Sequence, residues 1–284
     1  MLTGAGKIAG VVGWPIRHSL SPLLHGYWLQ ELTLNGAMVP LAVAREDFAR
    51  VIGSLQRAGF RGVNVTVPHK EAAFAMAHVC DGAAEEARAA NLLIFHDDGH
   101  IEARNTDTYG LTESLREEMR ALEGRTVLLL GAGGAARGAV LAMNALGAGK
   151  IQILNRHADK AAALATALKP RIKADIVTGG LEDWIALSAK ADLVVNTTSA
   201  GMKDNPPLTL DLTSLRNDAV VLDIVYNPLK TPFLKEAAAR GHKTIDGLGM
   251  LMHQAVPSFE AFFGVRPKVT PGLRACLEQA LDRA

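Results

Sequence analysis

The chain has 284 residues, of which 49% are hydrophobic, so it can bury a large apolar core without disulfides or metal ions. Lysine and arginine total 30, aspartate and glutamate total 29, and the formal net charge is +1. This balance argues against the basic face of a nucleic-acid-binding or membrane-surface protein, but it allows a site for a small anionic ligand.

The cysteines and the N-terminal segment are typical of a protein in a reducing compartment. Cys80 and Cys276 lie far apart and outside any CxxC spacing, so we expect neither a disulfide nor a metal site. Residues 1–13 contain only a short apolar run, and no window approaches the length of a membrane span. We therefore expect a cytoplasmic monomer or homodimer that acts on a small molecule and binds neither nucleic acid nor membranes.

In chain order, the first half alternates apolar runs with helical segments. Residues 8–12 form an apolar run bounded by glycines, which predicts a buried strand. Ser21 followed by Pro22 predicts a helix that has Ser21 as its N-cap and ends near Leu32. Further elements are expected at 38–43, 62–67, 91–95 and 100–103 (strands, the last two flanking a hairpin turn) and at 45–57 (a helix).

The pattern restarts after Asp107. A helical segment at 108–122 precedes a strand at 126–130, and similar short apolar runs follow at 151–154, 192–195 and 219–223. Such runs, separated by helical segments, indicate a parallel sheet with helices on both faces. We therefore predict an α/β protein with two domains. They are an N-terminal α/β substrate domain (1–107, completed by helices in 247–284) and a Rossmann-type, doubly wound dinucleotide-binding domain (108–246).

A glycine-rich turn follows the strand at 126–130. Gly131-Ala132-Gly133-Gly134-Ala135-Ala136 fits GxGxxG/A and directly precedes a helical segment, as a nucleotide-binding turn requires. The first glycine makes the tight turn, the second lets the pyrophosphate approach the backbone, and the helix N-terminus offers N–H groups to the phosphates. A glycine turn without a ligand is the alternative, which the flanking strand and helix disfavour.

The strand at 151–154 is followed by Asn155, Arg156 and His157, where NAD sites usually carry an acidic residue for the ribose 2′-hydroxyl. The Arg156 guanidinium matches a 2′-phosphate, and Lys160 adds charge one turn later, so we predict NADP rather than NAD. Two alternatives stay open. Asp159 could reach the ribose after a small loop shift, and Lys160 is equally at home as a surface lysine.

Polar residues follow the strands of the first half, where open sheets bind ligands. Ser19 and Ser21 alternate around one leucine, so both hydroxyls could hold a carboxylate. Thr66 and Lys70 lie at the end of the strand at 62–67, and Asp107 lies at the domain boundary. Taken singly, Ser21 and Asp107 could be N-caps and Lys70 a solvated lysine.

The chain resembles the shikimate dehydrogenase family over nearly its whole length. The segments that carry the resemblance are, in order, Pro15–Pro22, Asn64–Lys70, Asn105–Asp107, Gly131–Ala135, Asn155–Arg156, Asn196–Met202, Asp223–Pro232 and Asp246–Gln254. The resemblance implies a reversible, NADPH-dependent reduction of 3-dehydroshikimate to shikimate, within chorismate and aromatic amino acid biosynthesis.

The resemblance also implies roles for individual residues, with Lys70 and Asp107 as the catalytic pair. The substrate carboxylate would be held by Ser19, Ser21 and Tyr226, and the ring hydroxyls by Thr66, Lys70, Asn91, Asp107 and Gln254. Together with the motif above, the expected cofactor-binding set is Gly131, Ala132, Gly133, Gly134, Ala135, Asn155, Arg156, His157, Lys160, Ile224 and Gly247, with Ile224 and Gly247 beside the nicotinamide.

Two positions depart from the family pattern. Leu92 stands where the family often has threonine after asparagine, and Gly26 stands where it often has asparagine after histidine. Both bear on affinity and fine specificity. The alternatives are a quinate or mixed quinate/shikimate dehydrogenase that uses NAD, which Arg156 disfavours, and an idle dinucleotide-binding sensor, which is expected to lose Lys70 or Asp107. A folate-type dehydrogenase would not need the two-serine loop.

Overall fold

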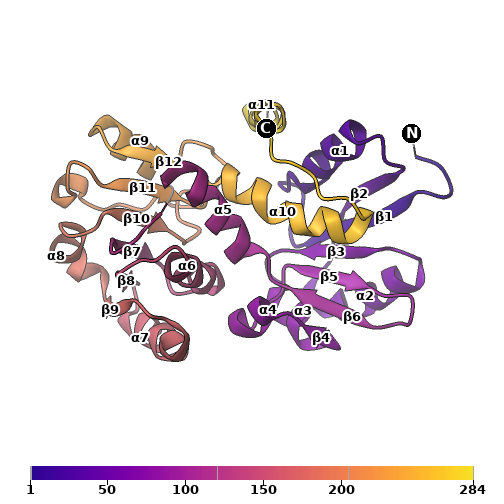
Figure 1. Ribbon diagram of the computed structural model, residues 1–284, viewed down its shortest axis with the longest axis horizontal. Helices are drawn as coiled ribbons and strands as arrows, with labels where there is room; N and C mark the ends of the chain where they lie inside the picture. Colours follow the sequence, from indigo (N-terminus) through magenta and orange to yellow (C-terminus); the bar gives the residue numbers. More distant parts are fainter. Residues whose placement is uncertain (1, 120, 204, 284) are drawn as a thin grey trace. The chain divides into compact units, whose positions relative to one another are not determined.

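The computed structural model describes residues 2–119, 121–203 and 205–283, and it divides into two compact units (Figure 1). The first unit contains the residues up to Thr106 together with Met252–Ala280, and the second contains Asp107–Leu251 and the residues from Leu281 onward. The second boundary falls inside helix α10 (Leu248–Phe263), whereas the sequence analysis placed it before Gly247. Both units are α/β, which confirms the predicted fold class.

The first unit is built on a mixed sheet in the order β2-β1-β3-β5-β6-β4. β1 pairs in parallel with β2 and β3, and β5 pairs antiparallel with β3 and β6. The β5–β6 hairpin was predicted, and Gly99 in its turn has a φ of +88°. The elements are β1 (Lys7–Gly13), α1 (Ser21–Glu31), β2 (Gly36–Ala42), η1 (Arg45–Asp47), α2 (Phe48–Arg57), β3 (Gly62–Val65), α3 (Lys70–Met76), β4 (Val79–Cys80), α4 (Gly82–Ala87), β5 (Leu92–Phe95), β6 (Ile101–Arg104), α10 and α11 (Pro271–Asp282).

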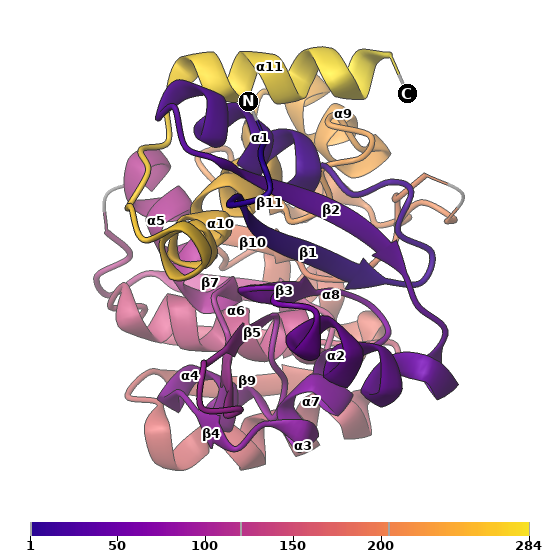
Figure 2. The ribbon, with the colours of Figure 1, turned by 90° about the vertical axis from the view of Figure 1, so that its right-hand side faces the viewer.

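Helices cover both faces of this sheet (Figure 2). On one face, α2 packs Phe48 and Ile52 against Val63 and Val65 of β3, and α3 and α4 complete the layer. On the other face α10 lies so close that a Cβ on Gly62 would meet the ring of Phe262 at 2.6 Å. The absence of a side chain at Gly62 therefore sets how near α10, which carries Gln254, can approach the strands.

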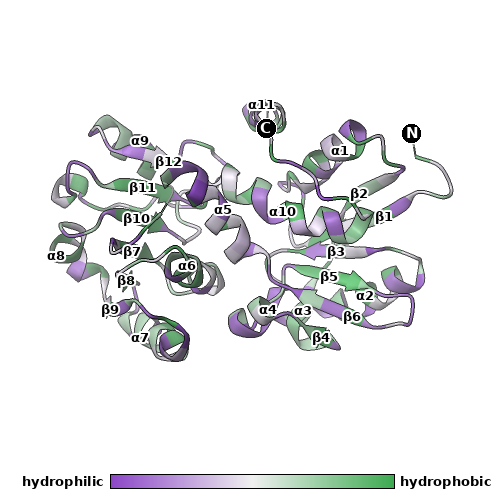
Figure 3. Ribbon diagram, viewed as in Figure 1, coloured by the Kyte–Doolittle hydropathy of each residue, from purple (hydrophilic) through white to green (hydrophobic). Residues whose placement is uncertain are grey.

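The second unit has an entirely parallel sheet in the order β9-β8-β7-β10-β11-β12, which is the Rossmann order 3-2-1-4-5-6. Its central strands are hydrophobic along their length (Figure 3). The elements are α5 (Asp107–Met119), β7 (Thr126–Leu130), α6 (Gly134–Ala145), β8 (Lys150–Leu154), α7 (Ala158–Leu168), η2 (Lys169–Arg171), β9 (Asp175–Gly179), η3 (Leu181–Asp183), α8 (Trp184–Ser188), β10 (Leu193–Asn196), η4 (Leu212–Ser214), β11 (Val220–Asp223), α9 (Pro232–Ala239) and β12 (Lys243–Ile245).

Alternate residues of these strands face two separate apolar layers. Val127 and Leu129 of β7 pack with α5, α6 and α7, whereas Leu128 and Leu130 pack with α8, η4 and α9. Burial on both faces is why the central strands read as unbroken apolar runs in the sequence. The edge strands β9 and β12 were not predicted, because they are only partly buried and lack such runs.

The start of α1 differs from the prediction. Ser21 is the first helical residue, Leu20 occupies the N-cap position, and no side chain caps the helix. Instead the backbone N–H of Ser21 donates to Ser19 Oγ at 3.3 Å. The hydroxyl of Ser19, and not that of Ser21, thus satisfies the N–H at this end. None of the described helices is long and apolar enough to cross a bilayer.

A histidine of α1 is enclosed by aromatic rings. His25 has no exposed surface, and its ring lies about 6 Å from those of Trp28, Phe259, Phe262 and Phe263. Neither ring nitrogen has a hydrogen-bond partner within the described residues. Burial therefore lowers the pKa of His25 from 6.5 to about 3.

The lowered pKa of His25 predicts that the free energy of unfolding falls in acid. The folded chain holds His25 neutral, whereas the unfolded chain takes up a proton below pH 6.5, so lowering the pH from 6.5 towards 3 favours unfolding. We expect this residue to contribute a slope of about 1.4 kcal/mol per pH unit to the free energy of unfolding. Urea unfolding at a series of pH values, followed by tryptophan fluorescence, measures this slope. His25→Leu should remove that slope while the exposed control His157→Ala keeps it, and equal slopes in both variants would contradict the assignment.

Candidate active site and cofactor site

A buried polar cluster lies at one end of the first sheet. Asn91, directly before β5, is 3% exposed, and its Oδ1 accepts a hydrogen bond from the Thr106 backbone N–H at 2.8 Å. Its Nδ2 donates to Oε1 of Gln254 at 3.2 Å. The structure thus brings together two of the predicted substrate-binding residues, one directly before β5 and one from α10. Thr106, whose hydroxyl lies 3.0 Å from Asn91 Nδ2, was quoted in a motif but given no role.

Asn64 extends this cluster to the middle of α10. Its Nδ2 donates to Ser258 Oγ at 2.7 Å and to the Asn91 carbonyl at 3.3 Å. Its buried Oδ1 has no partner within the described residues. Asn64 was quoted as the first residue of a motif but was given no role, although its polarity between Val63 and Val65 in a buried strand was a signal. The bond to Ser258 holds α10 against β3 one turn from Gln254, and the bond to the Asn91 carbonyl ties β3 to the residue that precedes β5.

The turn that contains Thr66 and Lys70 is held by backbone and imidazole contacts. The N–H of Thr66 donates to the Val12 carbonyl at 2.9 Å, which keeps the turn beside β1. His69 is buried, its Nε2 lies 2.7 Å from the Val43 carbonyl, and its ring stacks on Phe48 at 4.6 Å. Lys70 is then the first residue of α3 and is half-buried.

The two departures from the family pattern have different surroundings. Leu92 is fully buried in β5, so its side chain belongs to the core and offers nothing polar. A Cβ on Gly26 would meet no atom within 4 Å, so the glycine leaves open space beside His25. Neither position removes a contact that the polar cluster depends on.

In the second unit, the glycine-rich turn has a backbone conformation that requires glycine at its first position. Gly131 has a φ of +114°, and a Cβ there would lie 2.7 Å from Thr197 Oγ1. Gly133 and Gly134 are exposed with open space around them, and α6 begins at Gly134. Ala136 is fully buried against the strands, as the motif predicts. Ala132 and Ala135 lie between these positions and are half-buried. Free N–H groups at the start of a 12-residue helix, next to glycines that carry no side chain, fit a pyrophosphate.

The segment after β8 carries exposed positive charge. Asn155 Nδ2 donates to the His157 carbonyl at 2.9 Å, and the same carbonyl accepts from the Lys160 N–H, which starts α7. The side chains of Arg156 and Lys160 are exposed and form no ion pair or hydrogen bond within the described residues. They are therefore available to an anionic group. No cluster of metal-ligating side chains occurs in the part of the chain that the structure describes.

A second polar network closes the carboxyl ends of β10 and β11. Asp223 has no exposed surface; its Oδ1 accepts from Asn196 Nδ2 and from the Val225 N–H, both at 3.0 Å. Its Oδ2 accepts from Thr231 Oγ1 at 2.8 Å, and Thr231 is the N-cap of α9. Burial raises the pKa of Asp223, while these three hydrogen bonds oppose the rise. Sequence reasoning gave this residue no role.

This network positions the loop that follows β11, which carries Ile224 and Tyr226. Ile224 donates its N–H to the Asn196 carbonyl at 3.1 Å. Gly247 lies against the same segment, because a Cβ on Gly247 would collide with the Ile224 carbonyl. The structure thus brings together the two residues expected beside the nicotinamide. Burial raises the pKa of Tyr226, which keeps its phenol protonated and able to donate.

Asp107 is the first residue of α5 and the first residue of the second unit. It is half-buried, and its Cβ lies 3.8 Å from the point where a Cβ on Gly138 of α6 would stand. The start of α5 therefore packs beside α6 at ordinary van der Waals distance.

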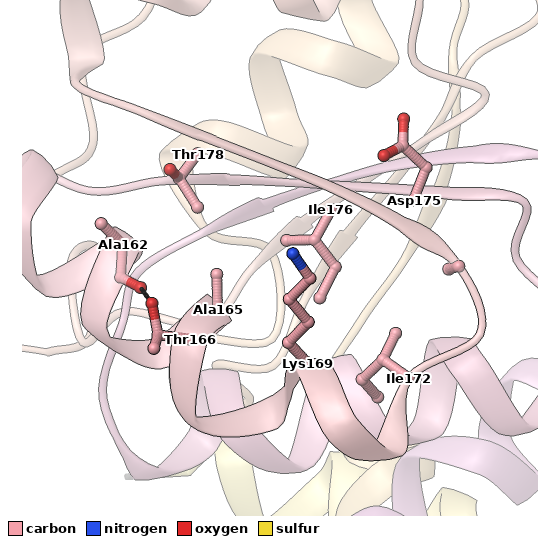
Figure 4. A pocket seen from close by; sticks show the side chains of 9 residues that line it. Ala162, Ala165, Thr166, Lys169, Ile172, Asp175, Ile176 and Thr178 are labelled. Carbon is pink, nitrogen blue, oxygen red and sulfur yellow. Dashed lines mark hydrogen bonds between the residues drawn. The ribbon is translucent and has the colours of Figure 1, made fainter.

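A surface hollow of about 420 Å³ lies between α7 and the edge strand β9 (Figure 4). Ala162 and Ala165 of α7 face Ile176 there, and Lys169 and Asp175 also line it. None of the predicted site residues lines it. The sheet ends at β9, so the small side chains of α7 have no further strand to cover, which accounts for the hollow.

Comparison with known proteins agrees with these observations. Residues 11–93 match the family model of the shikimate dehydrogenase substrate binding domain, and residues 113–206 match that of shikimate / quinate 5-dehydrogenase. A Paramagnetospirillum magneticum protein named shikimate dehydrogenase (NADP(+)) is 45% identical over 279 residues, covering 96% of this chain and 99% of that protein. The chain belongs to the shikimate dehydrogenase family. The predicted family is therefore confirmed.

Solved structures similar to this chain include members with different ligands. The shikimate 5-dehydrogenase of Thermus thermophilus, in complex with NADP(H) and shikimate, has a TM-score of 0.84 and 33% identity, covering 98% of this chain and 99% of that one. The quinate dehydrogenase of Corynebacterium glutamicum, in complex with NAD, has a TM-score of 0.88 and 28% identity, covering 96% of this chain and 99% of that one. The fold therefore does not separate these substrates or cofactors, and side chains must do so.

The glycine turn gives a test that needs no ligand. Gly131→Ala would force a positive φ on alanine and place its Cβ against Thr197 Oγ1, which is held by its hydrogen bond to the Leu130 carbonyl at 2.6 Å. We expect the free energy of unfolding to fall by roughly 1–3 kcal/mol. Gly134→Ala is the matched control, because it meets open space at the start of α6, and it should be neutral or slightly stabilising. Equal urea midpoints for the two variants would show that Gly131 is not conformationally required.

Proposed function

We propose that the chain catalyses the reversible reduction of 3-dehydroshikimate to shikimate with NADPH. The observation that supports this most strongly is the 43–47% identity to several proteins named shikimate dehydrogenase (NADP(+)) over nearly the whole chain. The buried Asn91–Gln254 pair supports a polyhydroxylated substrate, because each amide can both donate to and accept from ring hydroxyls. The unpaired Arg156 supports the 2′-phosphate of NADP.

The substrate would be held by groups that suit each of its parts. Ser19 and Ser21, with the protonated phenol of Tyr226, would donate to the carboxylate. Thr66, Asn91 and Gln254 would hold the ring hydroxyls. On the cofactor side, the turn Gly131–Ala135 would hold the pyrophosphate. Asn155, Arg156, His157 and Lys160 would hold the adenosine end, and Ile224 and Gly247 the nicotinamide end.

When bound, the nicotinamide supplies the hydride that reduces the ring carbonyl carbon. Lys70, as an ammonium, would donate its proton to the alkoxide oxygen that forms and would stabilise the developing negative charge. Asp107 would orient Lys70 and accept a hydrogen bond from a neighbouring ring hydroxyl. In the reverse direction a neutral Lys70 would take the hydroxyl proton. We also propose a cytoplasmic monomer or homodimer, which size-exclusion chromatography and cell fractionation would test.

Initial rates with shikimate and with quinate, each against NADP and NAD, test the function directly. We expect shikimate with NADP to give the highest kcat/KM. A preference for quinate with NAD would favour the alternative that the sequence left open, and no turnover with either acid would favour a dinucleotide-binding sensor.

The matched variant for this assay is Arg156→Ala. It should weaken the binding of NADPH far more than the binding of NADH, because only NADPH carries the 2′-phosphate. Equal losses for the two cofactors would count against Arg156 as the phosphate-binding residue.

Lys70→Ala tests the proton donor. We expect kcat to fall by about 10²–10⁴, while the Kd for NADPH, measured by its fluorescence, stays almost unchanged. Glu71→Ala is the control, because Glu71 is the exposed neighbour in the same first turn of α3 and should keep normal turnover. Near-normal turnover in Lys70→Ala would remove the lysine from the mechanism.

A further inference from the structure

We propose that the buried carboxylate of Asp223 favours the oxidised, cationic nicotinamide over the reduced, neutral one, and so biases the site towards hydride donation. This inference rests on the proposed function, because it assumes that the second unit binds a nicotinamide cofactor. It concerns a residue that holds and polarises the cofactor site and does not itself react.

The place of Asp223 in the sheet sets it on the nicotinamide half of the site. A dinucleotide lies outside the carboxyl ends of a doubly wound sheet, across the point where the strand order reverses. Here that point lies between β7 and β10. The glycine turn follows β7 and Arg156 follows β8, which assigns the phosphates and the adenosine to the β7–β8–β9 half. Asp223 ends β11, in the other half, and Ile224 follows it directly.

The charge on Asp223 is not neutralised by a neighbouring cation. Its three hydrogen-bond donors are an amide, a backbone N–H and a hydroxyl, all neutral. It forms no ion pair with any residue that the structure describes. With no exposed surface, its field is also little screened by water. Two unit charges about 10 Å apart interact with an energy of roughly 1 kcal/mol at an effective dielectric constant of about 20–40.

The geometry of the network does not itself require a charge. An asparagine side chain could accept from Asn196 and Val225 through its oxygen and donate to Thr231, whose hydroxyl can accept as well as donate. A carboxylate costs more to bury than an amide. Holding the loop in position therefore does not explain why this residue is charged. The nicotinamide offers an explanation, because it carries a formal positive charge only when it is oxidised.

The test compares the Kd values of the two cofactor forms in the full-length protein without substrate. NADPH fluorescence gives one value and displacement by NADP⁺ gives the other. For Asp223→Asn we expect the ratio of Kd for NADP⁺ to Kd for NADPH to rise about fivefold, which corresponds to about 1 kcal/mol. Thr231→Val is the matched control, because it removes one donor and keeps the charge, so both Kd values should move together.

Each outcome decides the matter. An unchanged ratio in a folded Asp223→Asn protein would overturn the inference, as would an equal rise in the ratio for Thr231→Val, which would assign the effect to position. If Asp223→Asn does not fold, Asp223→Ser removes the charge and leaves room for a bridging water. The ratio of Kd for NADP⁺ to Kd for NADPH in that variant then tests the inference in the same way. A parent protein that binds neither cofactor form would instead refute the proposed function.

Discussion

The candidate site depends on hydrogen bonds that polar side chains form at the ends of buried strands. Asn91 in the first unit and Asn196 and Asp223 in the second are almost or fully inaccessible to water. An unsatisfied polar group in such a place costs about 1–3 kcal/mol, so each has been given partners from neighbouring segments. Those partners are Thr106 and Gln254 for Asn91, and Val225 and Thr231 for Asp223. The same bonds fix the loops that carry the candidate residues.

Glycines complement these bonds by allowing backbones to approach one another. Gly62 admits the aromatic side of α10 to the first sheet, and Gly247 lies against the Ile224 carbonyl in the second unit. Gly131 does the same beside Thr197. Hydrogen bonds decide the orientation of the loops, and the missing side chains decide how close they come. Together they fix the local backbone around the candidate residues within each unit.

Charge is distributed differently at the two ends of the expected cofactor. Arg156 and Lys160 are exposed and unpaired in the described part of the chain, so they can meet an anionic phosphate without first breaking an ion pair within the protein. Asp223 is buried among neutral donors, where its charge acts over a longer range. Sequence comparison alone does not distinguish these situations, because burial and pairing decide what a charge does.

The sequence alone determined the α/β class, the glycine-rich turn and the family, because these follow from local periodicity and short motifs, and it led us to propose Arg156 as the residue that binds the 2′-phosphate. It did not determine the edge strands β9 and β12, which have no apolar run, or the start of α1, where the Ser19 hydroxyl replaces a cap by Ser21. Only the tertiary structure joined Asn64 to Ser258, 194 residues apart, and surrounded Asp223 with Asn196 and Thr231. Such pairings come from strand order and helix packing, and no single segment of the chain encodes them.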